Sequence, residues 1–196
     1  TLTDLQSLYP DFCGDFSPDW GLPTRADFER LEKEFSVVFP PSFIEFQTLH
    51  AAQMRAVGEG FRWANAPEPH LSLESLLRQA QERGHLALGL LPFWQDGGDA
   101  LAFDVSAAQA EPPVVWCMRD GSAFALADGF VPWLAACYED LRRDLMSHFN
   151  LNHLAGAASH AFFPAGHHQH ARPRHAFAAG AREIGRAHVW THVPLR

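Results

Sequence analysis

The chain has 196 residues, 47% of them apolar and 12% aromatic, with a formal net charge of −8 at pH 7. This is enough apolar material for one globular domain, and no stretch reaches the ~18 to 20 uncharged apolar residues that span a bilayer. Three isolated cysteines without a CxxC pair exclude a disulfide framework and a thiolate zinc site. No basic start precedes an apolar run, so we expect a cytoplasmic protein without membrane contact.

Charge is distributed unevenly along the chain. Residues 1–147 hold 22 of the 23 acidic side chains and 10 of the 15 basic ones, a net charge of −12, whereas residues 148–196 carry +4. A negative body repels phosphate backbones and anionic membranes, so we expect no nucleic-acid partner. A basic protein partner would instead be attracted and would associate quickly.

Three amphipathic helices are predicted in the first half of the chain. The first is capped by Thr24, with Asp27 three residues on in a capping-box relation. The second begins at Pro41, and the third is capped by Ser72 and stopped by Gly84. Helical spacing predicts these inward-facing side chains: Phe28, Leu31 and Phe35; Phe43, Phe46 and Leu49; Leu73, Leu76, Leu77 and Ala80.

After the third helix the apolar period changes from about 3.6 residues to two. Leu101, Phe103 and Val105 alternate with smaller or polar residues, and Phe124 and Leu126 do the same, which predicts half-buried strands. The connections QDGGD and RDGS contain the Asp-Gly and Gly-Gly steps that hairpin turns favour.

A last helix is predicted from near Asp128. Its apolar stripe consists of Phe130, Trp133, Leu134, Cys137, Leu141 and Leu145, and we expect Trp116 and Trp133 in the core. Helices followed by a run of short strands indicate the α+β class. We therefore predict a single domain over residues 1–147, with an antiparallel sheet meander packed against N-terminal helices and a C-terminal helix.

The tail over residues 148–196 differs from the rest of the chain. It contains nine of the twelve histidines, one acidic residue, and many alanines and glycines without a lasting period, so we expect disorder. The segment EIGRAHVWT resembles the read-through translation of a sequencing adapter, which suggests that part of this tail is an artefact. The tail histidines with metal-compatible spacing are His167, His168, His170 and His175, but no acid or cysteine fixes a geometry, so we expect no metal site.

Asp96 and Asp99 flank the glycines of QDGGD and are the strongest candidates for a catalytic or cation-binding pair. Aspartate and glycine are also what a tight turn selects for backbone reasons, and we favour that interpretation. Phosphate-loop, GxSxG and HExxH motifs are absent, and the histidines of the body occur singly. We expect neither enzymatic activity nor a cofactor, and we keep a hydrolase using these aspartates and a histidine as a minor alternative.

The order of motifs resembles the SUKH superfamily. FERLEKEFSVVFPPSFIEFQTLH is similar to its opening pair of helices with a glutamate at Glu32 and a break at Phe39-Pro40, and LSLESLL is similar to its next helix. LLPFWQDGGDALAFDV and VVWCMRDGSAFALADGFVPWL are similar to its two hairpins and closing helix, so the resemblance covers about residues 20–145. Members usually have an Asn-Gly turn after the second helix, where this chain has His50 to Gln53. We expect that helix to run on toward Arg55.

This resemblance implies a non-enzymatic α+β module, many bacterial members being immunity proteins that bind and neutralise a cognate toxin, often a nuclease. We expect the same function by occlusion of a basic protein toxin in the cytoplasm, with a regulatory protein-interaction scaffold as the alternative. Tryptophans beside carboxylates suit such contacts, although core packing is equally compatible with Trp63 and Trp94. The predicted partner-binding residues are Glu59, Trp63, Glu68, Trp94, Asp96, Asp99 and Asp120.

Overall fold

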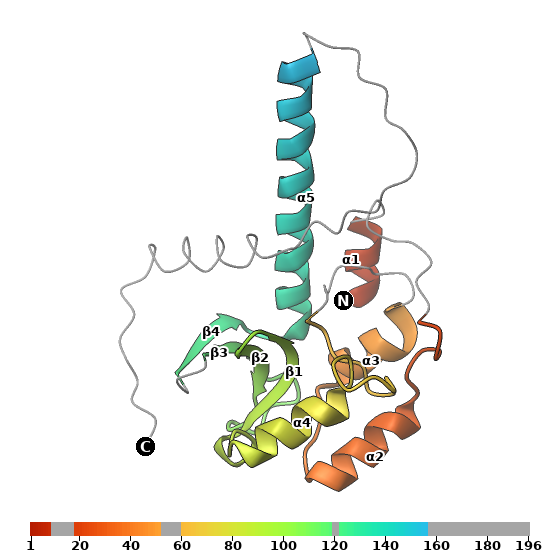
Figure 1. Cartoon of the computed structure of the whole chain (residues 1–196), viewed down its shortest axis with the longest axis vertical. Helices are drawn as coiled ribbons and strands as arrows, with labels where there is room; N and C mark the ends of the chain where they lie inside the picture. The colour runs from red at the N-terminus through yellow and green to blue at the C-terminus, as the bar shows by residue number, and fades with distance from the viewer. Residues whose placement is uncertain (9–17, 52–59, 119–121, 157–196) are drawn as a thin grey trace. The chain divides into compact units, whose positions relative to one another are not determined.

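The computed structural model describes residues 1–8, 18–51, 60–118 and 122–156, with side chains described as far as residue 143. The helical elements are α1 (Leu2–Leu8), α2 (Arg25–Phe35), α3 (Pro41–Glu45), η2 (Phe46–His50), α4 (Leu73–Glu82), η3 (Leu86–Leu88) and α5 (Phe130–Gly156). The strands are β1 (Leu90–Asp96), β2 (Asp99–Asp104), β3 (Val114–Cys117) and β4 (Ala123–Ala127). Figure 1 shows α4 beside β1, α2 beside α4, and the start of α5 at the sheet.

The predicted α+β class is confirmed. The strands form one antiparallel sheet in the order β1-β2-β3-β4, so each strand pairs with its neighbour in the chain. Within the described residues, no helix combines the length and the apolar character needed to cross a membrane. Residues 1–138 form one compact unit, which contains the whole sheet, and the chain from Glu139 belongs to a second.

The caps and inward faces predicted for α2 and α4 are confirmed. The amide of Thr24 donates to the carboxylate of Asp27 at 2.8 Å, and the hydroxyl of Ser72 accepts from the amide of Ser75 at 3.3 Å. Every apolar residue assigned to the inner faces of these two helices is buried. Helix α4 ends at Glu82, and Gly84 follows with φ of +78°, a conformation that glycine adopts without steric cost.

The second helix departs from its predicted register at one residue. Phe43 and Phe46 are fully buried as expected, but Leu49 is 66% exposed, so its assignment to the core was wrong. The cause is the backbone, which changes from α-helix in α3 to π-helix in η2. A π-turn contains more residues than an α-turn, so side chains beyond Phe46 rotate away from the positions that a period of 3.6 predicts.

Gln47, four residues after Phe43 and on the same face of the helix, is also in the core, where it is 0% exposed. Its side-chain amide donates to the carbonyl of Arg62 at 2.9 Å and accepts from the amide of Ala64 at 3.1 Å. One side chain thereby satisfies two backbone groups of the segment that follows η2, and it holds that segment against the helix.

The sheet confirms the predicted strands and both hairpins, but the half-buried face predicted for β4 at Phe124 was wrong. Leu101 and Phe103 are buried, Val105 lies just beyond the end of β2, and Phe124 remains 43% exposed on β4. The RDGS turn falls in residues 119–121, outside the described residues, but β3 and β4 pair on either side of it. Trp133 is buried as predicted, whereas Trp116 is only half-buried.

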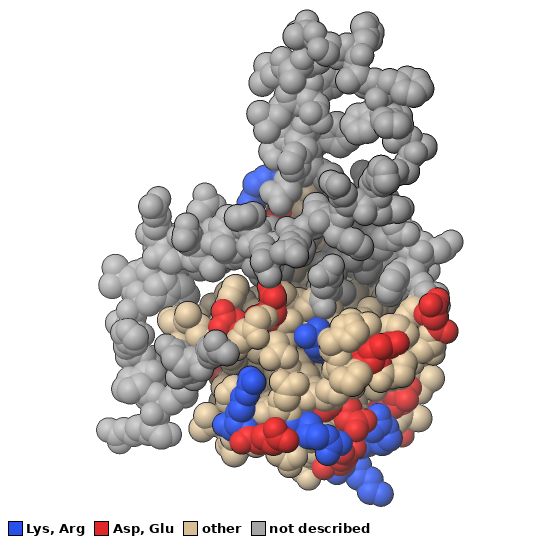
Figure 2. Space-filling model, viewed as in Figure 1, with Lys and Arg blue, Asp and Glu red and all other residues tan. Residues whose placement is uncertain are grey.

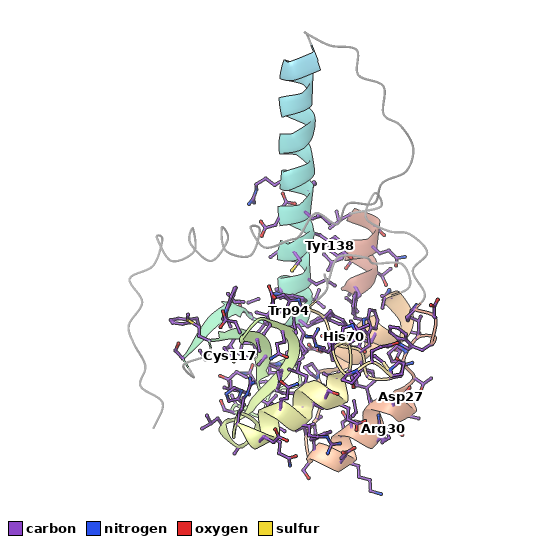
Figure 3. The ribbon with its side chains drawn as sticks, viewed as in Figure 1. Asp27, Arg30, His70, Trp94, Cys117 and Tyr138 are labelled. Atoms are coloured by element: carbon purple, nitrogen blue, oxygen red, sulfur yellow. The ribbon has the colours of Figure 1, made fainter. Side chains whose placement is uncertain are left out.

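Helix α5 follows its predicted stripe at first and then leaves it. Phe130, Trp133 and Leu134 are buried, Cys137 is half-buried, and Leu141 is 38% exposed, while the side chain of Leu145 is outside the described ones. Tyr138, which the stripe did not include, is fully buried (Figure 3). The helix continues past residue 147 to Gly156, and the domain boundary at that residue stays a prediction.

Replacing Gln47 by leucine should lower the free energy of unfolding by about 2 to 3 kcal/mol, because a buried amide and a buried carbonyl lose their partner. Leu49→Ala is the matched control and should change it by less than about 0.5 kcal/mol, since that side chain is exposed. Urea denaturation followed by tryptophan fluorescence measures both. The reverse ranking would contradict the burial of Gln47 and the exposure of Leu49.

Candidate functional site

The most prominent acidic feature at the edge of the sheet is the turn between β1 and β2. Asp96 ends β1, Asp99 begins β2, and the two are register partners across the hairpin. Gly97 has φ of +65°, so glycine is needed for the backbone at that corner. Asp96 is exposed and Asp99 half-buried, so two carboxylates lie close together at this turn.

A short segment, Gly60 to Trp63, lies along the outer edge of β1. The amide of Gln95 donates to the carbonyl of Gly60 at 2.8 Å, and the amide of Arg62 donates to the carbonyl of Phe93 at 3.1 Å. The Arg62 guanidinium donates back to the carbonyls of Gly60 and Gln95 at 2.8 and 3.2 Å. Arg62 was not among the predicted site residues, because nothing in the linear sequence connects it with the hairpin.

Arg62 and Asp96 interact electrostatically. Burial lowers the pKa of the Arg62 guanidinium from its ordinary value, and the Asp96 carboxylate acts in the opposite direction. The cation is thus bound mainly by backbone carbonyls, and Asp96 keeps its exposure. The Arg62 guanidinium therefore contacts the backbone next to Asp96 and leaves the Asp96 side chain exposed.

The two tryptophans proposed as anchors lie in the core. Trp63 is 7% exposed and packs edge-on against Phe61 with ring centroids 5.2 Å apart, and Trp94 is 9% exposed. Gly60 packs directly on the Trp94 indole, where a Cβ atom would overlap the ring. Figure 3 shows Trp94 within the body of the molecule, which is the position that the core-packing alternative expects.

Of the three remaining predicted residues, only Glu68 lies within the described part of the chain. Glu68 is half-buried in the loop over residues 64–71, which is closed by a hydrogen bond of 2.8 Å from the Trp63 amide to the Leu71 carbonyl. Its Oε2 atom is shielded from solvent. Glu59 and Asp120 lie outside the described residues. The structure therefore brings Asp96 and Asp99 together and assigns Glu68 to a separate loop.

Acidic side chains on α2 and α4 have a different role from those of the turn. Arg30 and Arg78 each contact both Glu34 and Glu74, at N–O distances of 2.7 to 3.5 Å, and these four residues form a network between the two helices. The arginines hold the pKa of Glu74 below its ordinary value, first through the hydrogen bond from Arg30. Figure 2 shows acidic and basic side chains interleaved over these helices, so opposite charges largely cancel on that face.

A shallow cleft adjoins the acidic turn. It holds about 20 Å³, room for about one water molecule, between the end of α4 and the sheet. Residues from both walls and from the turn line it, among them Arg83, His85, Gly98 and Cys117. Burial, and then the charge of Arg83, lower the pKa of His85, which favours a neutral imidazole at neutral pH. The cleft therefore offers a cation, a neutral ring and small apolar side chains, which suits protein contact.

The described residues do not show a catalytic arrangement around the aspartates. Neither Asp96 nor Asp99 lines the cleft that contains His85. Among the described side chains there is no group of three or more histidine, cysteine, aspartate or glutamate residues placed to hold a metal ion. His50 contacts Glu45 at 3.4 Å, and His70 is exposed in the loop after Glu68.

Two further carboxylates, those of Glu32 and Glu111, have structural roles. Glu32 accepts a hydrogen bond of 3.0 Å from the amide of Phe39, so it fixes the break between α2 and α3. Glu111, in the connection between β2 and β3, accepts from the amide and the hydroxyl of Ser42 at 2.9 and 2.5 Å. It caps α3 and ties that helix to the sheet.

A four-stranded antiparallel meander, with four described α-helices before it and one after it, defines a small α+β domain. A family model described as SMI1 / KNR4 family (SUKH-1) matches residues 22–136, and the chain belongs to this family. The predicted membership of the SUKH superfamily is thereby confirmed. The family is generally non-enzymatic. Comparison with curated proteins finds no match.

Gly60→Ala should destabilise the domain by about 1 to 3 kcal/mol, because the added methyl group must displace the Trp94 indole from a close-packed site. Gly129→Ala is the control, since a Cβ there lies at an ordinary 3.8 Å from the nearest atom, in Pro132. Thermal unfolding measured by circular dichroism compares the two. Equal melting temperatures would show that Gly60 does not pack on the ring.

Cys117 should resist alkylation in the native protein, because burial, and then the Asp104 charge, raise the pKa of its thiol to about 11. At pH 8 about one thiol in a thousand is then ionised. Iodoacetamide labelling followed by peptide mass spectrometry measures this, with the same protein in urea as the reference. Equal labelling of Cys117 in both states would contradict the burial.

Proposed function

We propose that this protein is a cytoplasmic immunity protein that binds a basic protein toxin, such as a nuclease, and neutralises it by occlusion. Family membership supports a binding role, which is compatible with either immunity or regulation. The observation that carries the choice of surface is the pair of carboxylates at the β1–β2 turn, Asp96 and Asp99, on a rigid hairpin beside an open cleft.

Charge distribution supports the turn over the other acidic segments. The glutamates of α2 and α4 are engaged with Arg30 and Arg78, so a toxin would have to break existing ion pairs to use them. Asp96 is exposed, and Arg62, which interacts with it electrostatically, also donates to backbone carbonyls. A basic side chain can therefore approach Asp96 from the solvent.

Packing narrows the set of contact residues. Because Trp63 and Trp94 are buried, we assign them the role of holding the Gly60–Trp63 segment and β1 in place behind the turn. Gln79 on α4 and Gln95 at the end of β1 are half-buried polar residues of the cleft wall that can contact a basic partner, whereas the cation Arg83 marks the limit of the acidic surface. The proposed surface is thus the acidic turn with the adjoining cleft, and Glu68 forms a separate, secondary contact.

The double variant Asp96→Lys/Asp99→Lys tests this surface. Full-length protein is mixed with the toxin domain encoded beside its gene, and association is followed by surface plasmon resonance at several salt concentrations. The variant should associate about 10-fold more slowly or worse at low salt, and the dependence of its rate on salt should weaken. Asp19→Lys/Glu29→Lys, with the same change in net charge on exposed residues elsewhere, is the matched control.

Two outcomes would count against the proposal. An equal loss of association rate in both double variants would mean that net charge alone attracts the partner and that the turn has no special role. Continued killing of cells that express the toxin together with this protein would remove the immunity function and leave the regulatory scaffold as the better candidate.

A further inference from the structure

One row of apolar side chains crosses three strands of the sheet on a single face. Its members are successive register partners on β2, β3 and β4, namely Leu101, Trp116 and Phe124. Register partners in an antiparallel sheet point to the same side, so the row is continuous. Exposure rises along the row, from the buried Leu101 through the half-buried Trp116 to Phe124, which is 43% exposed.

The helical cover of this face lies over β1 and β2. Phe103, two residues after Leu101 and on the same side of β2, packs against Phe130 of α5 with ring centroids 6.1 Å apart. Phe93 of β1 packs against Trp133 of α5 at 5.2 Å. Figure 1 shows β3 and β4 at the margin of the sheet away from α2 and α4. The described helices therefore leave the β3 and β4 end of the row accessible.

The two aspartates of the turn lie on this face as well. Asp99 precedes Leu101 by two residues on β2, and side chains two residues apart in a strand point to the same side. Asp96 is the register partner of Asp99 and therefore shares that side. The opposite side carries Ala100, which lines the cleft, whereas neither aspartate does. The turn thus carries its carboxylates on the face of the apolar row.

Met118 connects the apolar row with the turn. It follows Trp116 by two residues and is 40% exposed. Ala100 on β2 pairs with Cys117 on β3, so the next residues toward the turn, Asp99 and Met118, are neighbours on adjacent strands, about 5 Å apart. The accessible apolar side chains next to the acidic turn are Trp116, Met118 and Phe124, and we call them the apolar patch.

We propose that the apolar patch is the desolvated centre of the toxin contact, a proposal that rests on the function proposed above. The partner is a basic protein that places an apolar side chain over Trp116 and Phe124 and directs lysine or arginine side chains to Asp96 and Asp99. Aromatic residues and methionine are enriched at the centres of interfaces, and the rims are polar. The apolar patch and the acidic turn supply these two parts side by side on one face.

The charge beside the apolar patch favours a basic partner over a second copy of this chain. Two copies joined through the patch would bring their aspartate pairs close together, and like charges repel. The same carboxylates attract a basic surface. Strand β4 reads AFALA and has no ionisable side chain, so the apolar part of a partner meets no charge on it.

The kinetics of toxin binding separate the two parts of this surface. Carboxylates mainly raise the association rate, whereas desolvated apolar contacts mainly slow dissociation. Met118→Thr/Phe124→Thr keeps a strand-forming residue at Phe124 and should raise the dissociation rate of the toxin domain about 10-fold or more. Its association rate and the salt dependence of that rate should stay close to those of the wild type. Surface plasmon resonance of the full chain measures all three quantities, next to Asp96→Lys/Asp99→Lys.

Val38→Thr/Leu49→Thr is the matched control, because these apolar side chains are 77% and 66% exposed and lie outside the sheet. Toxin should dissociate from it as from the wild type. Thermal unfolding of both double variants should give melting temperatures close to that of the wild type, since all four side chains are exposed.

Hydroxyl-radical footprinting examines the apolar patch in the unmodified protein. Met118 and Phe124 should be oxidised in the free chain and should lose this oxidation when the toxin domain is bound. Leu49 should be oxidised equally in both states, because it lies outside the proposed contact.

The outcomes distinguish the apolar patch from the immunity function. A Met118→Thr/Phe124→Thr variant that dissociates at the wild-type rate, or patch side chains that stay equally oxidised in the complex, would overturn the patch, while slower association of Asp96→Lys/Asp99→Lys would still support the proposed function. A wild type that does not bind the toxin would overturn both. Weak oxidation of the patch in the free chain would mean that this chain or a second copy covers it, and would overturn the patch alone.

Discussion

The packing of one ring, Phe43, holds the domain together. It is completely buried on α3, and its centroid lies 5.3 to 6.0 Å from six other phenylalanine rings. Those rings come from α2, the break before α3, the segment along β1, the strands β1 and β2, and the start of α5. Edge-to-face and tilted contacts at such distances are favourable beyond the apolar area that they bury. Each of these elements therefore contributes a ring to a single cluster, and β1 and β2 cannot shift relative to α2, α3 and α5 without breaking its contacts.

Polar contacts around this cluster align the surrounding backbone. Glu32 fixes the break before α3, Glu111 caps α3 from the β2–β3 connection, and Gln47 satisfies the backbone of the segment that covers β1. All three bind backbone amides, which are costly to bury without a partner. Through Gln47, the π-helical turn of η2 positions the Gly60–Trp63 segment, and that segment in turn supports the acidic hairpin.

This arrangement makes the two edges of the sheet unequal. The β1 edge is covered, and its hairpin turn carries carboxylates next to a cleft, whereas no described residue pairs with the outer side of β4. A charged turn suits fast association with a basic partner. The ion-pair network between α2 and α4 serves packing between helices, because its charges are already compensated.

The sequence alone determined the fold class, the caps of α2 and α4, the inward faces of those helices and the QDGGD turn, because all of these depend on local periodicity or on residue-specific backbone geometry. It also grouped Asp96 with Asp99, since they are close in the chain. Only the tertiary structure decided that Leu49 faces solvent, because a π-turn overrides the helical period there, and that the buried amide of Gln47 finds its partners on distant backbone. It likewise decided the burial of Trp63 and Trp94, the binding of Arg62 behind the hairpin and the open edge of β4. These depend on contacts between residues far apart in the chain, which no local pattern encodes.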